Sequence, residues 1–123
     1  MSSENRVALI TGSASGIGRA VALAFSRGGY DLVINYSRSA SQADETAEMC
    51  HALGAKTLVV KCDVAQDTEV LSMIDACKNQ YGRLDVLVNN AGTTMDISPQ
   101  NMTFLTKMFS QNTLLLTKYV IFA

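Results

Sequence analysis

The sequence VALITGSASGIGRA, residues 7–20, decides the fold of this chain. Its first part, Val7–Ile10, is an uninterrupted apolar run, which is typical of a strand buried on both faces of a parallel sheet. A glycine-rich segment follows, and from Gly16 onward apolar residues recur every three or four positions, which predicts a helix. We expect the inner face of this helix to consist of Ile17, Val21, Ala24 and Phe25.

The rest of the chain alternates short apolar runs with longer amphipathic segments in the same way. Further strands are predicted at 30–35, 57–62 and 84–89. Ser39 and Gln42 are spaced as a capping box, which predicts a second helix that ends at Gly54. A third helix precedes Gly82, and a last one begins near Asn101. The expected inner faces of these helices are Ala43, Ala47 and Cys50; Val70, Ile74, Cys77 and Tyr81; and Leu105, Met108, Asn112, Leu115 and Tyr119.

Continuous apolar strands that alternate with helices predict an α/β fold, with helices on both faces of a parallel sheet. Right-handed crossovers then favour a Rossmann-type doubly wound sheet with strand order 3-2-1-4. In such sheets ligands bind beyond the carboxyl ends of the strands, where the strand order reverses between the first and fourth strands. No linker or internal repeat interrupts residues 1–123, so we expect a single domain.

Composition argues against several classes of function. Ten basic and eleven acidic residues give a net charge of −1 without a basic cluster, so nucleic-acid binding is not expected. The three cysteines stand far apart without a C-x-x-C pair, and there is a single histidine, so we expect reduced thiols and no metal site. No stretch approaches the roughly 20 apolar residues of a membrane span, and the N-terminus lacks a signal-peptide core. We therefore expect a soluble, cytoplasmic protein without a membrane partner.

The glycine-rich segment Thr11–Gly18, TGSASGIG, joins the first strand to the first helix. Glycine tolerates positive φ in a tight turn, and without a Cβ it lets the backbone approach a pyrophosphate closely. The N–H groups at the start of the following helix then face the phosphates. Arg19 and Ala20 stand where a P-loop has Lys and Ser or Thr, which excludes that motif. A glycine-rich turn without a ligand is the alternative interpretation.

Three marks, in the right order on the right elements, resemble the classical short-chain dehydrogenase/reductase family. Thr11–Gly18 is similar to the T-G-x-x-x-G-(I/L)-G cofactor loop of that family. The segment 89–92, Asn-Asn-Ala-Gly, resembles its N-N-A-G mark after the fourth strand, and Asp63 resembles the Asp that closes its third strand. The resemblance is strongest for the branch of 3-oxoacyl-acyl-carrier-protein reductases. It implies the N-terminal, dinucleotide-binding part of an oxidoreductase that transfers a hydride between a nicotinamide and a carbonyl or alcohol.

The resemblance also implies roles for individual residues. The pyrophosphate and ribose would be lined by Gly12, Ser13, Ser15, Gly16, Ile17 and Gly18. Asp63 would accept a hydrogen bond from the adenine amino group, with Val64 beside it. Asn90, Ala91 and Gly92 would pack along the cofactor. A turn cap at Asp63, and a loop merely shaped by the asparagines, are the alternatives.

The end of the second strand distinguishes NADP from NAD. An acid at this point would bind the ribose 2′-OH and repel a phosphate, but the segment 35–39 reads Asn-Tyr-Ser-Arg-Ser. Arg38 can instead contact a 2′-phosphate, with Ser37 or Ser39 adding hydroxyl donors. The sequence therefore favours NADP over NAD as the cofactor. An Arg on a solvated loop is the alternative.

Catalysis in the resembled family implies a Tyr, a Lys four residues later and an upstream Ser. The residues four positions after the tyrosines are Ile34, Ala40, Asp85 and Ala123, so this sequence holds no Tyr-x-x-x-Lys. Asn112 matches a family Asn that holds water in a proton relay, and an Asn bonded to local backbone is the alternative. We expect a truncated enzyme that keeps its grip on the cofactor and is inactive alone.

Three functions are therefore compared. The first is an NADP(H)-dependent oxidoreductase in truncated form, and the second is a non-enzymatic nucleotide-binding module. The third, a methyltransferase, gives no explanation for the N-N-A-G segment. Because the fourth strand would be left as a sheet edge, self-association through that edge is also expected.

Overall fold

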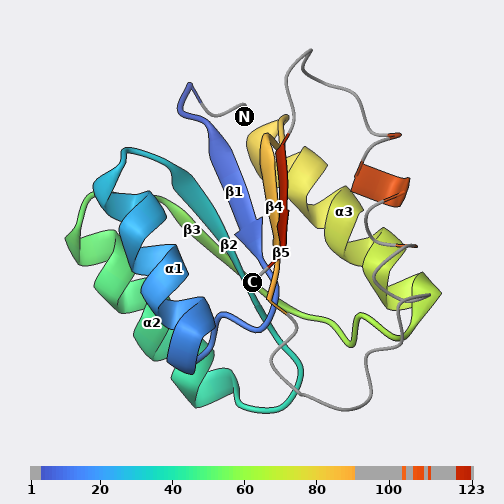
Figure 1. The fold of residues 1–123 in the computed structure, drawn as a ribbon, viewed down its shortest axis with the longest axis horizontal. Coiled ribbons are helices and arrows are strands. Elements are labelled where there is room, and N and C mark those ends of the chain that lie inside the picture. The colour runs from blue at the N-terminus through green and yellow to red at the C-terminus, as the bar shows by residue number, and fades with distance from the viewer. Residues whose placement is uncertain (1–3, 91–103, 105–106, 110, 112–118, 123) are drawn as a thin grey trace.

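The computed structural model describes residues 4–90, 104, 107–109, 111 and 119–122 (Figure 1). The elements in chain order are β1 (Val7–Ile10), α1 (Gly16–Arg27), β2 (Asp31–Tyr36), α2 (Ala40–Ala52), β3 (Thr57–Lys61), α3 (Asp67–Tyr81), β4 (Val86–Asn89) and β5 (Tyr119–Phe122). Residues 104, 107–109 and 111 are helical. The predicted alternation of strands and helices is confirmed, with element bounds shifted by one or two residues.

The strands form one parallel sheet in the order β3-β2-β1-β4-β5. Helices α1 and α2 lie on one face of this sheet, and α3 lies on the other (Figure 1). The Rossmann-type α/β fold and the predicted order 3-2-1-4 are therefore confirmed. The order reverses between β1 and β4, where Ile10 pairs with Val88. This is the point at which doubly wound sheets bind their ligands.

The predicted exposed edge at β4 is wrong. Strand β5 pairs with β4 in parallel, from Val86 opposite Tyr119 to Asn89 opposite Phe122. Tyr119, which was predicted to lie on the face of the last helix, begins this strand instead. The segment Tyr-Val-Ile-Phe consists of β-branched and aromatic residues, which favour strands. Strand β5 occupies the β4 edge through which self-association was expected, so that edge is not open.

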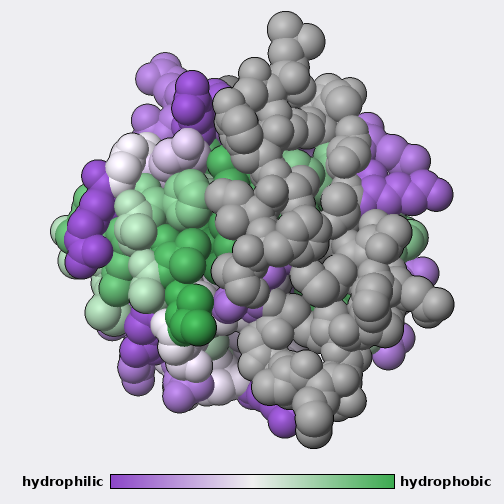
Figure 2. Space-filling model, in the orientation of Figure 1, coloured by the Kyte–Doolittle hydropathy of each residue, from purple (hydrophilic) through white to green (hydrophobic). Residues whose placement is uncertain are grey.

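The predicted inner faces of α2 and α3 are confirmed, but that of α1 is only partly right: Val21 and Phe25 pack half-buried against the core, and its other two members are exposed. In α1 the buried residues are Gly18, Ala22 and Ser26, whereas Ile17 is 69% exposed. The helix turns its smallest residues toward the rest of the fold, so packing distance decides its orientation rather than hydrophobicity. Ser26 is accommodated because its hydroxyl donates to the carbonyl of Ala22 at 3.0 Å. The surface over α1 is accordingly apolar (Figure 2).

The core has two parts, one on each face of the sheet. Val7 and Leu9 point toward α3, while Ala8 and Ile10 point toward α1 and α2, as the alternation of side chains along a strand requires. Phe109 joins the α3 side, although the predicted face of the last helix omitted it. Among the residues described, no helix is long and apolar enough to cross a membrane.

Two buried carboxylates bind backbone N–H groups at the end of the sheet where the strands begin. Asp31 accepts a hydrogen bond from the N–H of Lys56 at 3.0 Å. Asp85 accepts one from the N–H of Val7 at 2.8 Å and forms a two-pronged ion pair with Arg83 at 3.0 and 3.1 Å. These carboxylates therefore stabilise the amino ends of the strands. The glycine loop lies at the other, carboxyl end of the sheet.

Tyr81 gives a test of the buried hydrogen bonds in this core. Its hydroxyl is buried and donates to the carbonyl of Leu32 at 2.9 Å, across 49 residues of sequence. Tyr81→Phe keeps the ring and removes the donor, so the free energy of unfolding should fall by about 1 kcal/mol in urea denaturation. Tyr30→Phe is the matched control, because it keeps the edge-on packing of this ring against Phe25. The free energy of unfolding should change by no more than about 0.5 kcal/mol in that variant. Equal losses in both variants would contradict the role of the Tyr81 hydroxyl.

Candidate functional site

The glycine loop lies at the carboxyl end of β1, at the point where the sheet order reverses. Helix α1 begins at Gly16, and its N-cap residue Ser15 makes no side-chain capping hydrogen bond. The first N–H groups of a helix have no acceptors within the helix, and they carry the positive end of its dipole. Ser15, Gly16 and Ile17 are exposed. This end of α1 can therefore receive an anion.

Two glycines shape this loop for different reasons. Gly16 has φ of +61°, a left-handed conformation that side chains disfavour, although an added Cβ would meet nothing within 4 Å. Gly18 is limited by space instead. A Cβ there would collide with the carbonyl group of Gly12 and would lie 2.6 Å from Nδ2 of Asn90. The first turn of α1 thus rests directly on the backbone of the loop.

Asn90 ties the end of β4 to the glycine loop. Its side-chain amide donates to the carbonyls of Thr11 and Gly12, each at 3.3 Å. Its backbone N–H donates to the hydroxyl of Thr11 at 2.9 Å. Asn90 therefore lies against the glycine loop, and its packing along a cofactor stays a prediction. Its predicted companions Ala91 and Gly92, and Asn112 of the proposed relay, lie outside the described residues.

Asn35, at the end of β2, holds the loop from the other side, and sequence reasoning missed this role. Its Oδ1 accepts from the N–H of Gly12 at 3.1 Å, and its Nδ2 donates to the carbonyl of Cys62 at 3.1 Å. Ser13 donates its hydroxyl to the carbonyl of Ile10 at 2.8 Å and accepts from the N–H of Asn35 at 3.0 Å. The side chain of Ser13 is thus used inside the loop rather than turned toward a ligand.

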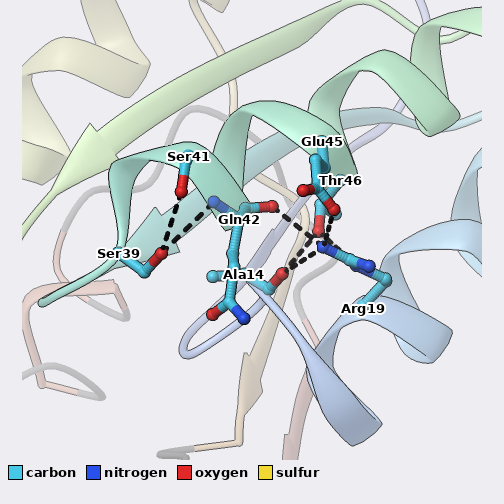
Figure 3. A network of polar contacts seen from close by, with 7 residues as sticks. All are labelled: Ala14, Arg19, Ser39, Ser41, Gln42, Glu45 and Thr46. Carbon is cyan, nitrogen blue, oxygen red and sulfur yellow. Dashed lines mark hydrogen bonds and ion pairs between the residues drawn. The ribbon is translucent and has the colours of Figure 1, made fainter.

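A second missed group, the Arg19 network, joins the loop to α2 (Figure 3). The carbonyl oxygen of Ala14 accepts from Nη2 of Arg19 at 2.8 Å and from the hydroxyl of Thr46 at 2.9 Å. Nε of Arg19 donates to the same hydroxyl at 2.8 Å. Arg19 also reaches the carbonyl of Gln42 at 3.0 Å and the carboxylate of Glu45 at 3.4 Å. The five residues therefore form one connected cluster beside the loop.

Asp63 begins the turn between β3 and α3. One carboxylate oxygen, Oδ1, accepts from the N–H of Ala65 at 2.9 Å, and the backbone N–H of Asp63 donates to Glu69 at 3.0 Å. The turn cap considered from the sequence is thus present, while the Asp63 side chain stays exposed. Val64 turns its side chain into the core. Burial, with Glu69 and Asp63 nearby, raises the pKa of the neighbouring Cys62 thiol to about 12.

The segment between β2 and α2 presents its polar side chains to solvent. Ser39 caps α2, since its hydroxyl accepts from the N–H of Gln42 at 3.3 Å, which confirms that half of the predicted capping box. Ser37 and Arg38 are exposed. Within the part of the chain that the structure describes, the guanidinium of Arg38 makes no hydrogen bond or ion pair, so its donors remain available.

Comparison with known proteins agrees with this arrangement. A family model described as short chain dehydrogenase matches residues 6–116. The chain belongs to this family. The short-chain dehydrogenase/reductase homolog YusS of Bacillus subtilis is 41% identical over 93 residues, which are 76% of this chain and 85% of YusS. The 3-oxoacyl-acyl-carrier-protein reductase FabG of Staphylococcus epidermidis is 41% identical over 92 residues, which are 75% of this chain.

Solved structures of short-chain dehydrogenases share this fold. A short-chain type dehydrogenase/reductase from Mycobacterium marinum aligns with a TM-score of 0.85 and 25% identity over 95% of this chain and 54% of that chain. A structure described as a dehydrogenase from Burkholderia cenocepacia with bound NADP aligns with a TM-score of 0.78 and 25% identity over 87% of this chain and 48% of that chain. This short-chain dehydrogenase chain spans 38% of the FabG relative named above.

The contact between α1 and the loop predicts a sharp response to substitution at Gly18. In Gly18→Ala the new Cβ must displace the Gly12 carbonyl or Asn90, so the free energy of unfolding should fall by about 1–3 kcal/mol. Gly28→Ala is the control, because φ is −82° there and the nearest atom would lie at 3.4 Å. That change should be neutral or stabilising by up to about 1 kcal/mol. Urea denaturation measures both, and a stable Gly18→Ala protein would contradict the close packing.

Proposed function

We propose that this chain is a dinucleotide-binding domain that binds NADP(H) at the glycine loop, as part of an oxidoreductase of the short-chain dehydrogenase type. The observation that carries the proposal is the uncapped N-terminus of α1, which follows a loop whose own backbone is already held by Asn35 and Asn90. When bound, the nicotinamide group supplies or accepts the hydride exchanged with a carbonyl or alcohol. The bound NADP of the Burkholderia cenocepacia structure supports this choice.

The residues of the loop fit a diphosphate. An added Cβ at Gly16 would meet no atom within 4 Å, so the backbone there is open to a close approach. The first turn of α1 contains no acidic residue that would repel phosphate. The N–H groups of Gly12 and Ser13 are used by Asn35, so we assign the phosphates to the N–H groups of Ser15 and the start of α1. Ile17, exposed beside them, would pack against the bound group.

The ends of β2 and β3 would hold the adenosine part. Oδ1 of Asp63 caps the turn, and within the described residues Oδ2 makes no hydrogen bond, so Oδ2 would accept from the adenine amino group. Val64 would contribute its backbone rather than its buried side chain. Arg38 and Ser37, both exposed, would receive the 2′-phosphate, while Ser39 caps α2. The charge of Arg38 is therefore the basis for preferring NADP over NAD.

Calorimetric titration tests the proposed preference. The chain should bind 2′,5′-ADP more tightly than 5′-AMP, and Arg38→Ala should remove the difference. The loss should be about 1.5 kcal/mol, at the lower end for a charged hydrogen bond because Arg38 is exposed and screened. Arg27→Ala, in the last turn of α1 far from the loop, should leave both affinities unchanged. Equal affinities of the unaltered chain for the two nucleotides would refute the choice of NADP.

A second candidate function is a nucleotide-binding module without catalysis. The observation in its favour is that no tyrosine in this sequence is followed by a lysine four residues later. Tyr81 is also buried, and burial raises the pKa of its hydroxyl above the ordinary range for tyrosine. It therefore cannot serve as a proton donor to a substrate. The two candidates share the cofactor site and differ in whether a carbonyl is reduced.

Turnover measurements test whether this chain by itself carries any of the chemistry. We expect binding of NADPH without its oxidation, because the Tyr and Lys that would deliver the proton are not in this sequence. The absorbance of NADPH should stay constant in the presence of a 3-oxoacyl thioester, a ketose or an aliphatic ketone. The reaction without protein is the baseline. Oxidation above that baseline would show that other residues carry the chemistry and would reject the module.

A further inference from the structure

We infer that Arg19 and Thr46 are positioning residues for the diphosphate, because together they fix the direction of the peptide group between Ala14 and Ser15. The inference rests on the proposed function, and it adds two residues to the site that no part of the glycine motif contains. Arg19 follows the loop on α1, while Thr46 comes from α2, 27 positions later in the sequence. Neither needs to touch the cofactor to act.

The Ala14 carbonyl is held from two sides (Figure 3). Nη2 of Arg19 donates to it at 2.8 Å, and the hydroxyl of Thr46 donates to it at 2.9 Å. A carbonyl oxygen has two lone pairs, so these two donors use its full capacity. The donors are themselves linked, because Nε of Arg19 donates to the Thr46 oxygen at 2.8 Å. The direction of this carbonyl is therefore strongly determined.

The direction of the carbonyl sets the direction of the next N–H. In a trans peptide group the C=O and the N–H that follows it point in opposite directions within one plane. Because the oxygen of Ala14 points to Arg19 and Thr46, the N–H of Ser15 points away from them. Ser15 is the exposed N-cap of α1, so its N–H lies at the end of the helix that we assign to the diphosphate. The network would thus aim this donor before any ligand arrives.

The chemistry of the cluster suits positioning better than direct attraction. Thr46 is fully buried, and Arg19 is mostly buried, so their mutual hydrogen bonds are shielded from water. Glu45 is 64% exposed and lies 3.4 Å from Arg19, so this ion pair contributes little. Nε of the guanidinium donates to Thr46, and Nη2 donates to the carbonyls of Ala14 and Gln42. A lysine would keep the charge but could not offer this fork of donors.

Two ligands distinguish positioning from a general loss of structure. NADP+ carries the diphosphate, whereas 2′-AMP carries adenine, ribose and a 2′-phosphate without it. In Arg19→Ala the affinity for NADP+ should fall about tenfold or more, the change that corresponds to about 1.4 kcal/mol. The affinity for 2′-AMP should stay within about twofold. Arg27→Ala, an exposed arginine on the same helix, is the matched control and should leave both affinities unchanged.

Conservative variants separate geometry from charge. Arg19→Lys should weaken NADP+ binding nearly as much as Arg19→Ala. Thr46→Val should also weaken NADP+ binding, whereas Thr46→Ser should bind NADP+ as tightly as the unaltered chain. If Arg19→Lys binds NADP+ as well as the unaltered chain, charge alone matters and the inference is overturned. Equal weakening of NADP+ and 2′-AMP, or no weakening of either, also overturns it. If the unaltered chain fails to bind NADP+, the proposed function fails instead.

An NMR measurement without ligand tests the inference even if the unaltered chain fails to bind NADP+. The backbone amide of Ser15 should shift in the NMR spectrum of ligand-free Thr46→Val and return to its original position in Thr46→Ser, while amides of α3 stay unchanged. A Ser15 amide that does not respond in Thr46→Val would overturn the inference independently of any cofactor.

Discussion

The closeness of helix α1 to the loop before it is the constraint on which the site depends. Gly18 sits so near the carbonyl of Gly12 that not even a methyl group fits between them. This contact brings the N-terminal end of the helix up against the carboxyl edge of β1. A bulkier residue would hold the helix away, and the helix dipole would then act on a displaced point in space. The electrostatics of the site are therefore a consequence of packing.

Two asparagines maintain this arrangement from the strands on either side of β1. Asn35 from β2 and Asn90 directly after β4 both reach the backbone of Gly12, one as acceptor and one as donor. A side-chain amide offers both functions, which suits a loop whose carbonyls and N–H groups would otherwise be buried without partners. In the part of the chain that the structure describes, no buried side-chain polar atom is left without a hydrogen bond. The loop is thus held in shape by the sheet and does not rely on a ligand.

Short sequence patterns and the handedness of crossovers were enough to predict much of the fold. The first strand, the capping of α2 by Ser39 and the strand order followed from apolar runs, spacing and crossover handedness. Features that depend on the folded chain were missed. Ile17 matched the helical spacing but lies outside, because α1 packs through its small residues. Tyr119 continued an apolar spacing over residues 105–119 yet begins β5, where pairing with β4 outweighs that spacing. Asn35 reaches Gly12 across 23 positions, and Arg19 reaches Thr46 across 27 positions, so both contacts lie beyond any motif window.

The loop is anchored through the carbonyl of Ala14, and among the described residues the side chain of Ser15 makes no hydrogen bond. Position 15 can consequently accept many residue types while the backbone path is preserved, whereas the side chain of Ala14 packs against the core. Substitution at position 15 would leave the backbone path almost unchanged. It would alter the side chain that faces a bound molecule at little cost to folding. A sequence pattern that requires one residue type at position 15 will therefore overlook proteins built on the same scaffold.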